Sequence, residues 1–313
     1  MRCAPRWLLG LGLTLLSALA GATEGGIGRP ITGQQITSFA GVIPPTPGLL
    51  FSVSSVYYQG DMGGSRQFPQ GGAINAGLDA EVSYNLANLT YVWNTGPGRW
   101  NFASAIGLPF QYTHIQVDVS GLRQRVRTDR STQFADILVT PIAAGYHFSE
   151  TEHLSLALPI YAPTGSYDPQ RLANAGQNTW TFSPTLAFTR LGGGGAEFTM
   201  MTALDFYTRN DDTNYKSGTT FRLEGIWTTA IAEGWALGAV GGWIEQVQKD
   251  SGPVADFFGG FKGPAVGAGP ILNWGGKLGQ QRASLSLRWV HDFEAKNRPK
   301  GNGVNLSVNL PFM

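Results

Sequence analysis

Residues 303–312 of this 313-residue chain read GVNLSVNLPF, in which apolar and polar side chains alternate. Val304, Leu306, Val308, Leu310 and Phe312 share one parity, and Asn305, Ser307 and Asn309 share the other. Because successive side chains of a β-strand point to opposite faces, the pattern predicts a strand with one apolar and one polar face. Residues 282–293 repeat it, and residues 153–161 and 178–191 carry equally clear apolar faces.

Clusters of Gly, Asn, Asp and Pro divide the chain into twelve such segments, for which we predict strands. They lie at 49–59, 76–94, 99–119, 134–148, 153–161, 178–191, 196–208, 218–231, 235–248, 264–274, 282–293 and 303–312. The gaps after odd-numbered strands have at least nine residues, and those after even-numbered strands are mostly short turns. Short turns on one side and long loops on the other are typical of bacterial outer-membrane barrels. We therefore predict an all-β fold, a transmembrane, antiparallel, up-and-down β-barrel of about 12 strands with both termini in the periplasm.

The composition agrees with a barrel wall. Charged residues make up only 14% of the chain, Gly supplies 43 positions, and aromatic residues reach 12%. The alternative, a soluble β-sandwich or periplasmic barrel, rarely needs nine Trp and an apolar outer face on nearly every strand. Several aromatic residues lie near strand ends, where they would form girdles at the two membrane interfaces.

The N-terminus carries the features of a secretory signal peptide, with Arg2 and Arg6 before an apolar run at residues 8–19. Small residues permit cleavage after Ala20 or Ala22, and we favour Ala22, so that residues 1–22 are removed. The mature chain then has no cysteine, 20 basic and 21 acidic residues, and a net charge of about −1 (20 − 21). This balance suggests no nucleic-acid partner.

Residues 23–48 are rich in Gly and too apolar for an ordinary linker. We predict that they enter the lumen as a partial plug, with a loose periplasmic arm as the alternative, and that residues 49–313 form the barrel. In the segment 76–94 the apolar parity changes between Leu86 and Leu89, from which we predict a bulge near residues 86–88.

Charged residues at the polar parity of two predicted strands should point into the lumen. Arg222 and Glu224 alternate with apolar residues in 218–231, and Arg288 and Asp292 do so in 282–293. An Arg facing lipid near the membrane midplane would cost roughly 2 to 4 kcal/mol. The four residues either pack as an ion-pair network or line a path for solutes.

Four consecutive predicted strands each contain a proline, at Pro109, Pro141, Pro159 and Pro184. Proline cannot donate to a strand ladder, and a closed barrel has no edge on which to place it. We predict one belt of bulged or kinked strands at these positions. The belt either only curves the wall or opens laterally, so that a hydrophobic solute passes from the lumen into the bilayer.

The gap before residue 134 holds Arg123, Arg125, Arg127 and Arg130. In an extended segment the first three project to one side. We predict a basic outer loop that is either merely solvated, or lines the pore mouth, or binds lipopolysaccharide phosphates, which Arg can contact through two parallel hydrogen bonds.

These strands and turns resemble the outer-membrane proteins of the meta-pathway phenol degradation family, also called the SphA family. The resemblance is carried by five short motifs, which are Pro44–Leu49, Phe134–Pro141, Gly145–Phe148, His153–Leu158 leading into Pro163–Asp168, and Asn178–Pro184. It implies an outer-membrane barrel connected with uptake of aromatic or other hydrophobic compounds. Such barrels usually end in an aromatic residue that the barrel assembly machinery reads, whereas Phe312 is followed here by Met313.

No pattern in the mature chain predicts a metal site, a cofactor or an enzyme. A phospholipase-type barrel would need Ser, His and an orienting polar group at one site, and His114 with Ser120 is the nearest approach. His153 and His291 are expected too far apart to share a metal ion. Two function classes therefore stand. One is a passive channel for small hydrophobic or aromatic molecules in the outer membrane of a Gram-negative bacterium, in contact with its lipids. The other is a structural or enzymatic barrel with a blocked lumen.

Overall fold

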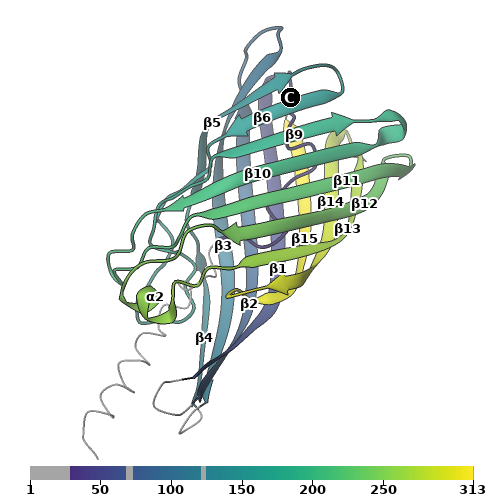
Figure 1. Ribbon diagram of the computed structural model, residues 1–313. Coiled ribbons are helices and arrows are strands. Elements are labelled where there is room, and N and C mark those ends of the chain that lie inside the picture. Colours follow the sequence, from purple (N-terminus) through teal and green to yellow (C-terminus); the bar gives the residue numbers. More distant parts are fainter. Residues whose placement is uncertain (1–28, 68–72, 121–124, 313) are drawn as a thin grey trace, which may run out of the picture.

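The computed structural model describes residues 29–67, 73–120 and 125–312, whose strands form one antiparallel sheet closed into a barrel (Figure 1). Its strands are β1 (Gly48–Gln67), β2 (Ala73–Val92), β3 (Trp100–Ser120), β4 (Arg125–Phe134), β5 (Leu138–His147), β6 (Glu152–Ala157), β7 (Ile160–Tyr161), β8 (Thr181–Phe182), β9 (Thr185–Leu191), β10 (Glu197–Tyr207), β11 (Thr220–Ala232), β12 (Trp235–Gln246), β13 (Pro264–Leu278), β14 (Gln281–Ala295) and β15 (Lys300–Phe312). A 3₁₀ turn, η1 (Gly193–Gly195), and one helical turn, α2 (Pro253–Phe258), complete the elements. No described helix has the length and apolar character needed to cross a membrane. The predicted signal peptide at residues 1–22 lies outside the described residues.

The wall has twelve strands, because three of its positions are each filled by two short strands. β4 and β5 both pair with β3, and β8 and β9 both pair with β10. β6 and β7 together fill the position between them. β1 pairs with β15 over the full length of the latter, and this contact closes the barrel. The predicted twelve-stranded antiparallel barrel is confirmed.

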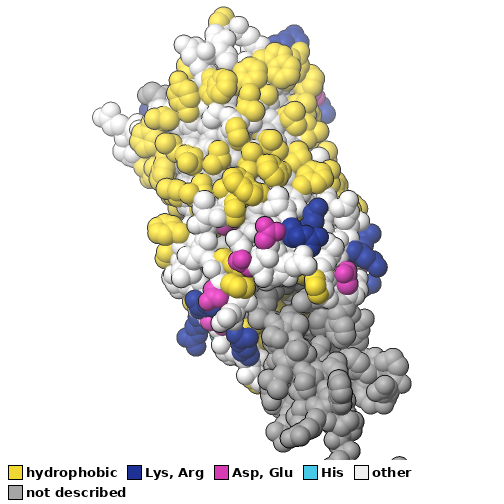
Figure 2. Space-filling model, turned by 90° about the vertical axis from the view of Figure 1, so that its left-hand side faces the viewer, with side chains coloured by type: hydrophobic (Ala, Val, Ile, Leu, Met, Phe, Trp, Pro, Cys, Tyr) yellow, Lys and Arg dark blue, Asp and Glu magenta, His cyan; other side chains and the backbone are white. Residues whose placement is uncertain are grey.

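Alternation along the strands gives the wall its two faces. In β10 the side chains of Glu197 and Thr199 are buried inside, whereas Phe198 and Met200 are exposed outside. Figure 2 shows the exposed apolar side chains as a broad belt, with acidic and basic side chains gathered on the part of the surface beside it. Near the short turns, Trp100 packs on Tyr146 with ring centroids 4.8 Å apart, which places aromatic rings at that edge of the belt.

The bulge that we predicted near residues 86–88 is wrong. β2 pairs with β1 and with β3 without any register shift along its length. Val82, Tyr84 and Leu86 simply face the lumen. The change of apolar parity therefore marks a stretch of apolar lumen wall, not a kink in the strand.

The predicted outer loops at 60–75 and 120–133 are largely strand, which corrects the boundaries of the first four strands. β1 and β2 pair as far as Gln67 and Ala73, and β3 pairs with β4 from Val119 onward. Gly and Asp residues in these stretches resemble turn residues in sequence. Beyond the apolar belt, however, they sit in a paired sheet whose two faces tolerate polar side chains. This sheet extends past the other strands at one end of the barrel (Figure 1).

Candidate solute pathway

Residues 29–47, which we call the inner segment, run through the interior of the barrel. At the end with the long loops, Arg298 donates a hydrogen bond to the Pro30 carbonyl at 2.9 Å. Near the end with the short turns, the Gly41 N–H donates to the Thr189 hydroxyl at 3.0 Å. Because β1 begins at the short-turn end, the chain crosses the lumen before it enters the wall.

Arg222 and Glu224 project from β11 into this interior and are both almost fully buried. The guanidinium of Arg222 makes two hydrogen bonds to Asp205 on β10, at 2.9 and 3.1 Å, and lies 3.5 Å from Glu224. Glu224 accepts a hydrogen bond from the Gln35 N–H at 3.2 Å. The two residues thus form an ion-pair network that also holds the inner segment.

Arg288 and Asp292 project inward from β14. Arg288 donates to the Gly33 carbonyl at 3.1 Å and to the Ile36 carbonyl at 2.6 Å. Asp292 accepts a hydrogen bond from the Tyr58 hydroxyl at 2.9 Å. Three of the four charges that the sequence singled out therefore bind the inner segment or its ion-pair network, and the fourth ties β14 to β1.

A second ion pair in the interior was not found from the sequence. Arg29 donates to Asp136 at 2.7 Å, and its guanidinium lies 4.6 Å from the ring centroid of Tyr161. Asp136 also accepts hydrogen bonds from the N–H groups of Gly165 and Gln177. It therefore joins the inner segment to the loop between β7 and β8. The one available signal was an acidic residue inside the otherwise apolar run 134–142.

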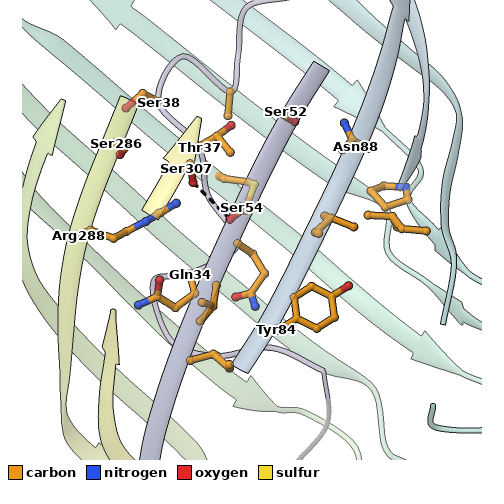
Figure 3. A pocket seen from close by; sticks show the side chains of 18 of the residues that line it. Gln34, Thr37, Ser38, Ser52, Ser54, Tyr84, Asn88, Ser286, Arg288 and Ser307 are labelled. Atoms are coloured by element: carbon orange, nitrogen blue, oxygen red, sulfur yellow. Dashed lines mark hydrogen bonds between the residues drawn. The ribbon is translucent and has the colours of Figure 1, made fainter. Parts of the chain in front are cut away.

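A cavity of about 970 Å³ remains between the inner segment and the wall. On one side it is lined by apolar groups of β2, β5 and the β6–β7 junction, including Val82, Leu86, Leu138 and Pro159. Elsewhere the lining is mixed, because β1, β14, β15 and the inner segment contribute apolar groups such as Leu50 and Val56 together with polar ones, including Ser54, Ser286, Arg288, Ser307 and Gln34. Figure 3 shows several of these side chains converging on one space. The cavity therefore has an apolar region beside β2, β5 and the β6–β7 junction and a mixed lining elsewhere.

The wall strands are interrupted at two of the four predicted prolines. β6 ends at Ala157 and β7 begins at Ile160, so that Pro159 lies in the gap. β8 ends at Phe182 and β9 begins at Thr185, so that Pro184 lies in the adjoining gap. The Pro159 carbonyl still accepts from the Ser183 N–H at 2.9 Å, so the strands stay together across a weakened ladder.

Pairing is also irregular at the other two prolines. The register between β3 and β5 shifts between Ala103 and Ala105, opposite Pro141. Pro109 lies where β3 changes its partner from β5 to β4, and its carbonyl accepts from the Ala135 N–H at 3.0 Å. We call Pro109, Pro141, Pro159 and Pro184 the proline seam.

The proline seam borders the apolar side of the cavity. Pro159 itself lines the cavity, as do Ser104 and Thr140, which flank Pro141 in the ladder. On the outside, the seam is flanked by exposed apolar side chains, among them Leu108, Ile142 and Leu158. Only the thickness of the wall separates the cavity from the surface belt at this place.

The predicted basic outer loop is a strand. Arg123 lies outside the described residues, and Arg125, Arg127 and Arg130 belong to β4, with Arg127 and Arg130 on opposite faces. Arg127 donates to the Gln170 carbonyl at 2.7 Å. Binding of lipopolysaccharide by this strand stays a prediction.

Asp129 on β4 lies beyond the apolar belt and holds the loop between β7 and β8. It accepts hydrogen bonds from Arg171 at 2.8 Å and from the N–H groups of Leu172 and Ala173. Burial alone would raise the pKa of Asp129, but these donors outweigh it and lower the pKa to about 2. The carboxylate therefore stays charged, and the loop stays bound, down to strongly acidic pH.

The histidines do not form a catalytic or metal-binding group with the residues considered in the sequence. His114 lies 3.5 Å from Glu81, and Ser120 is six positions further along the same strand, roughly 20 Å away at ~3.3 Å per residue. His147 on β5 and His153 on β6 have their Nδ1 atoms 2.6 Å apart. In the described ranges, no three His, Cys, Asp or Glu side chains are grouped so that they could hold a metal ion.

The chain is similar to several solved structures. The COG4313 outer membrane channel from Pseudomonas putida F1 has a TM-score of 0.69 and 16% identity, over 89% of this chain and 100% of that one. A Pseudomonas aeruginosa FadL homologue gives a TM-score of 0.48 and 9% identity, over 92% and 99% of the two chains. The β-domain of the Bordetella autotransporter BrkA gives 0.47 and 14%, over 85% and 100%. The closed barrel and the first of these similarities show a protein of the Gram-negative outer membrane.

No curated protein matches the sequence. A family model does match, over residues 63–308, and its description is the MetA-pathway of phenol degradation. The match spans most of the chain and nearly all of the barrel wall, and it agrees with the resemblance carried by the short Gly and Pro motifs. The chain therefore belongs to this family of outer-membrane barrels.

Proposed function

We propose that the protein is a channel for passive uptake of small hydrophobic or aromatic compounds across the outer membrane. The observation that carries this proposal is the cavity of about 970 Å³ inside the barrel, with an apolar wall lined by Val82, Leu86 and Pro159. Porin channels for sugars and ions have a polar interior, whereas part of this cavity is lined by apolar side chains. The similarity in fold to an outer membrane channel supports a transport role, as does the match to the phenol degradation family.

We further propose that solutes leave sideways through the proline seam into the bilayer. The inner segment occupies the direct route to the periplasm, whereas the seam adjoins the apolar side of the cavity. Each proline lacks the N–H that would otherwise complete the ladder, and lipid cannot replace that hydrogen bond. The strands can therefore separate here at lower cost than elsewhere in the wall.

Restoring the missing donors tests the lateral route. The triple variant Pro109→Thr, Pro141→Thr and Pro184→Thr should slow uptake of toluene or phenol into proteoliposomes several-fold, because the ladder becomes continuous. Ion conductance and barrel assembly should stay unchanged. The matched control is Pro270→Thr, since Pro270 lies in β13, whose pairing keeps one register on both sides of it.

The outcomes separate the two function classes. Unaffected uptake in a correctly assembled triple variant would make the lateral route wrong. A wild-type protein that admits neither aromatic solutes nor sugars would instead favour the alternative, a structural or enzymatic barrel with a blocked lumen. That alternative draws its support from the inner segment, which fills much of the interior.

A further inference from the structure

Two histidines face each other at the short-turn end of the lumen. His147 on β5 and His153 on β6 are directly opposite in the ladder, next to the turn that joins these strands (Figure 1). Gly145 and Ser155, which have the same parity as the histidines, lie against the inner segment. Because side chains two residues apart share a face of a strand, both imidazoles point inward. Their Nδ1 atoms lie 2.6 Å apart, with the ring planes at 78°.

A hydrogen bond on its far side fixes the proton of the His147 ring. Asn101 on β3 is 1% exposed, and its Nδ2 donates to the Thr95 hydroxyl at 3.2 Å. Its Oδ1 therefore faces His147 and accepts a hydrogen bond from Nε2 at 2.7 Å. In the neutral ring the proton is then on Nε2, so that Nδ1 presents a lone pair to His153.

The His153 ring has an acceptor of its own, because it makes a hydrogen bond to the backbone of Glu150 in the turn. Each imidazole thus combines a carbonyl partner with an Nδ1 atom that is directed at the other ring. Histidines that bind metal ions are held in the same way, because one ring nitrogen donates to a carbonyl or carboxylate and leaves the other to coordinate. Two lone pairs at this distance repel each other, and a cation between them removes the repulsion.

The distance between the rings is close to that of a two-histidine metal site. Zn–N bonds are about 2.0–2.1 Å long, and at a tetrahedral angle they hold the two nitrogens roughly 3.3 Å apart. The rings need to separate by only about 0.7 Å (3.3 − 2.6) to reach this geometry. His153 is buried, whereas His147 is partly exposed, so an ion can reach the pair and keep water molecules as its remaining ligands.

We propose that His147 and His153 bind a divalent transition-metal ion that prefers imidazole ligands, with Zn²⁺ as the reference ion. The ion ties β5 to β6 at the short-turn end of the barrel. It lies beside Gly145 and Ser155, where the inner segment contacts the wall. The site goes beyond solute uptake and does not depend on what crosses the lumen.

Zn²⁺ binding to the untagged full-length protein in lipid nanodiscs, with empty nanodiscs subtracted, tests this site. We expect one Zn²⁺ per chain and no binding of Mg²⁺, which prefers oxygen ligands. Asn101→Leu removes the acceptor that orients His147, and it should weaken Zn²⁺ binding about tenfold, the usual cost of losing such a partner. His147→Gln and His153→Gln remove a ligand each and should weaken it further.

The matched control is the double variant His114→Gln and His291→Gln, which removes the other two of the four histidines and should bind Zn²⁺ as the wild type does. Heat-modifiable migration on gels shows whether each variant has assembled. A second measurement needs no variant, because bound Zn²⁺ should protect His147 from carbethoxylation by diethyl pyrocarbonate, mapped by mass spectrometry.

The reactivity of His114 and His291 should be the same with and without Zn²⁺. The proposal is overturned if Zn²⁺ leaves the modification of His147 unchanged, or if the wild type binds Zn²⁺ no more tightly than assembled His147→Gln protein. Loss of binding in the control variant would also overturn it, because the ion would then be held elsewhere.

Discussion

Arg222 illustrates what strand parity predicts about a single residue. Parity alone places Arg222 and Glu224 on the lumen face of β11, and both are buried there. Parity alone does not identify the ion-pair partner of Arg222. Ala203 on β10 is directly opposite Arg222, and Asp205 lies two residues further along β10, diagonally across the ladder. That relation depends on the register between β10 and β11, which no single strand contains.

Removing one partner of this buried pair should be costly. Among the described residues, Asp205→Asn leaves Glu224, at 3.5 Å, as the one ion-pair partner of Arg222. Breaking a buried ion pair typically costs about 3–5 kcal/mol. We expect a clear fall in the urea concentration at which the barrel unfolds in lipid vesicles, followed by tryptophan fluorescence.

The control for this change is Asp211→Asn in the exposed loop after β10, which should shift the free energy of unfolding by no more than about 0.5 kcal/mol. If the two variants unfold at the same urea concentration, the Arg222 network contributes little to stability. The network would then serve to hold the inner segment in the lumen and not to stabilise the barrel.

At the scale of the elements, the predictable features were those that repeat. Alternation and turn length gave the number and order of the strands, because every wall strand obeys them. The outer extension of β1 to β4 was not predictable, since paired strands beyond the membrane need no apolar face and resemble loops. The apolar inner face of β2 was interpreted as a bulge for a related reason. A lumen was expected to be polar, and Val82 and Leu86 break that rule at the cavity.

The inner segment is the element whose removal has the clearest expected effect. Deleting residues 23–43 removes the chain that crosses the lumen, together with its contacts to Glu224 and Arg288. We expect a higher single-channel conductance in planar bilayers. A synthetic peptide of residues 29–43, added to the deletion variant, should reduce the conductance again. An unchanged conductance after deletion would show that the segment does not obstruct the lumen.

In the whole molecule, the cavity lies between the inner segment and the wall, and the proline seam borders its apolar side. The prolines could be predicted as one belt, because they lie on four consecutive strands at similar distances from the short turns. That the belt adjoins the apolar side of a cavity could not, because the cavity exists only once the inner segment is in place. In the proposed function, these three features together form the route from the lumen to the lipid.

The exit of the solute is the most direct test of this route. Photolabelling with 4-benzoylphenol in proteoliposomes, mapped by mass spectrometry, reports where a hydrophobic solute contacts the wall. We expect labelling around Leu108, Ile142 and Leu158 to exceed that of the wall around Pro270, and the excess to disappear in the triple proline variant. Labelling concentrated instead at the short-turn end, around Ile43 and Val92, would show that the solute leaves through the periplasmic mouth and would contradict lateral release.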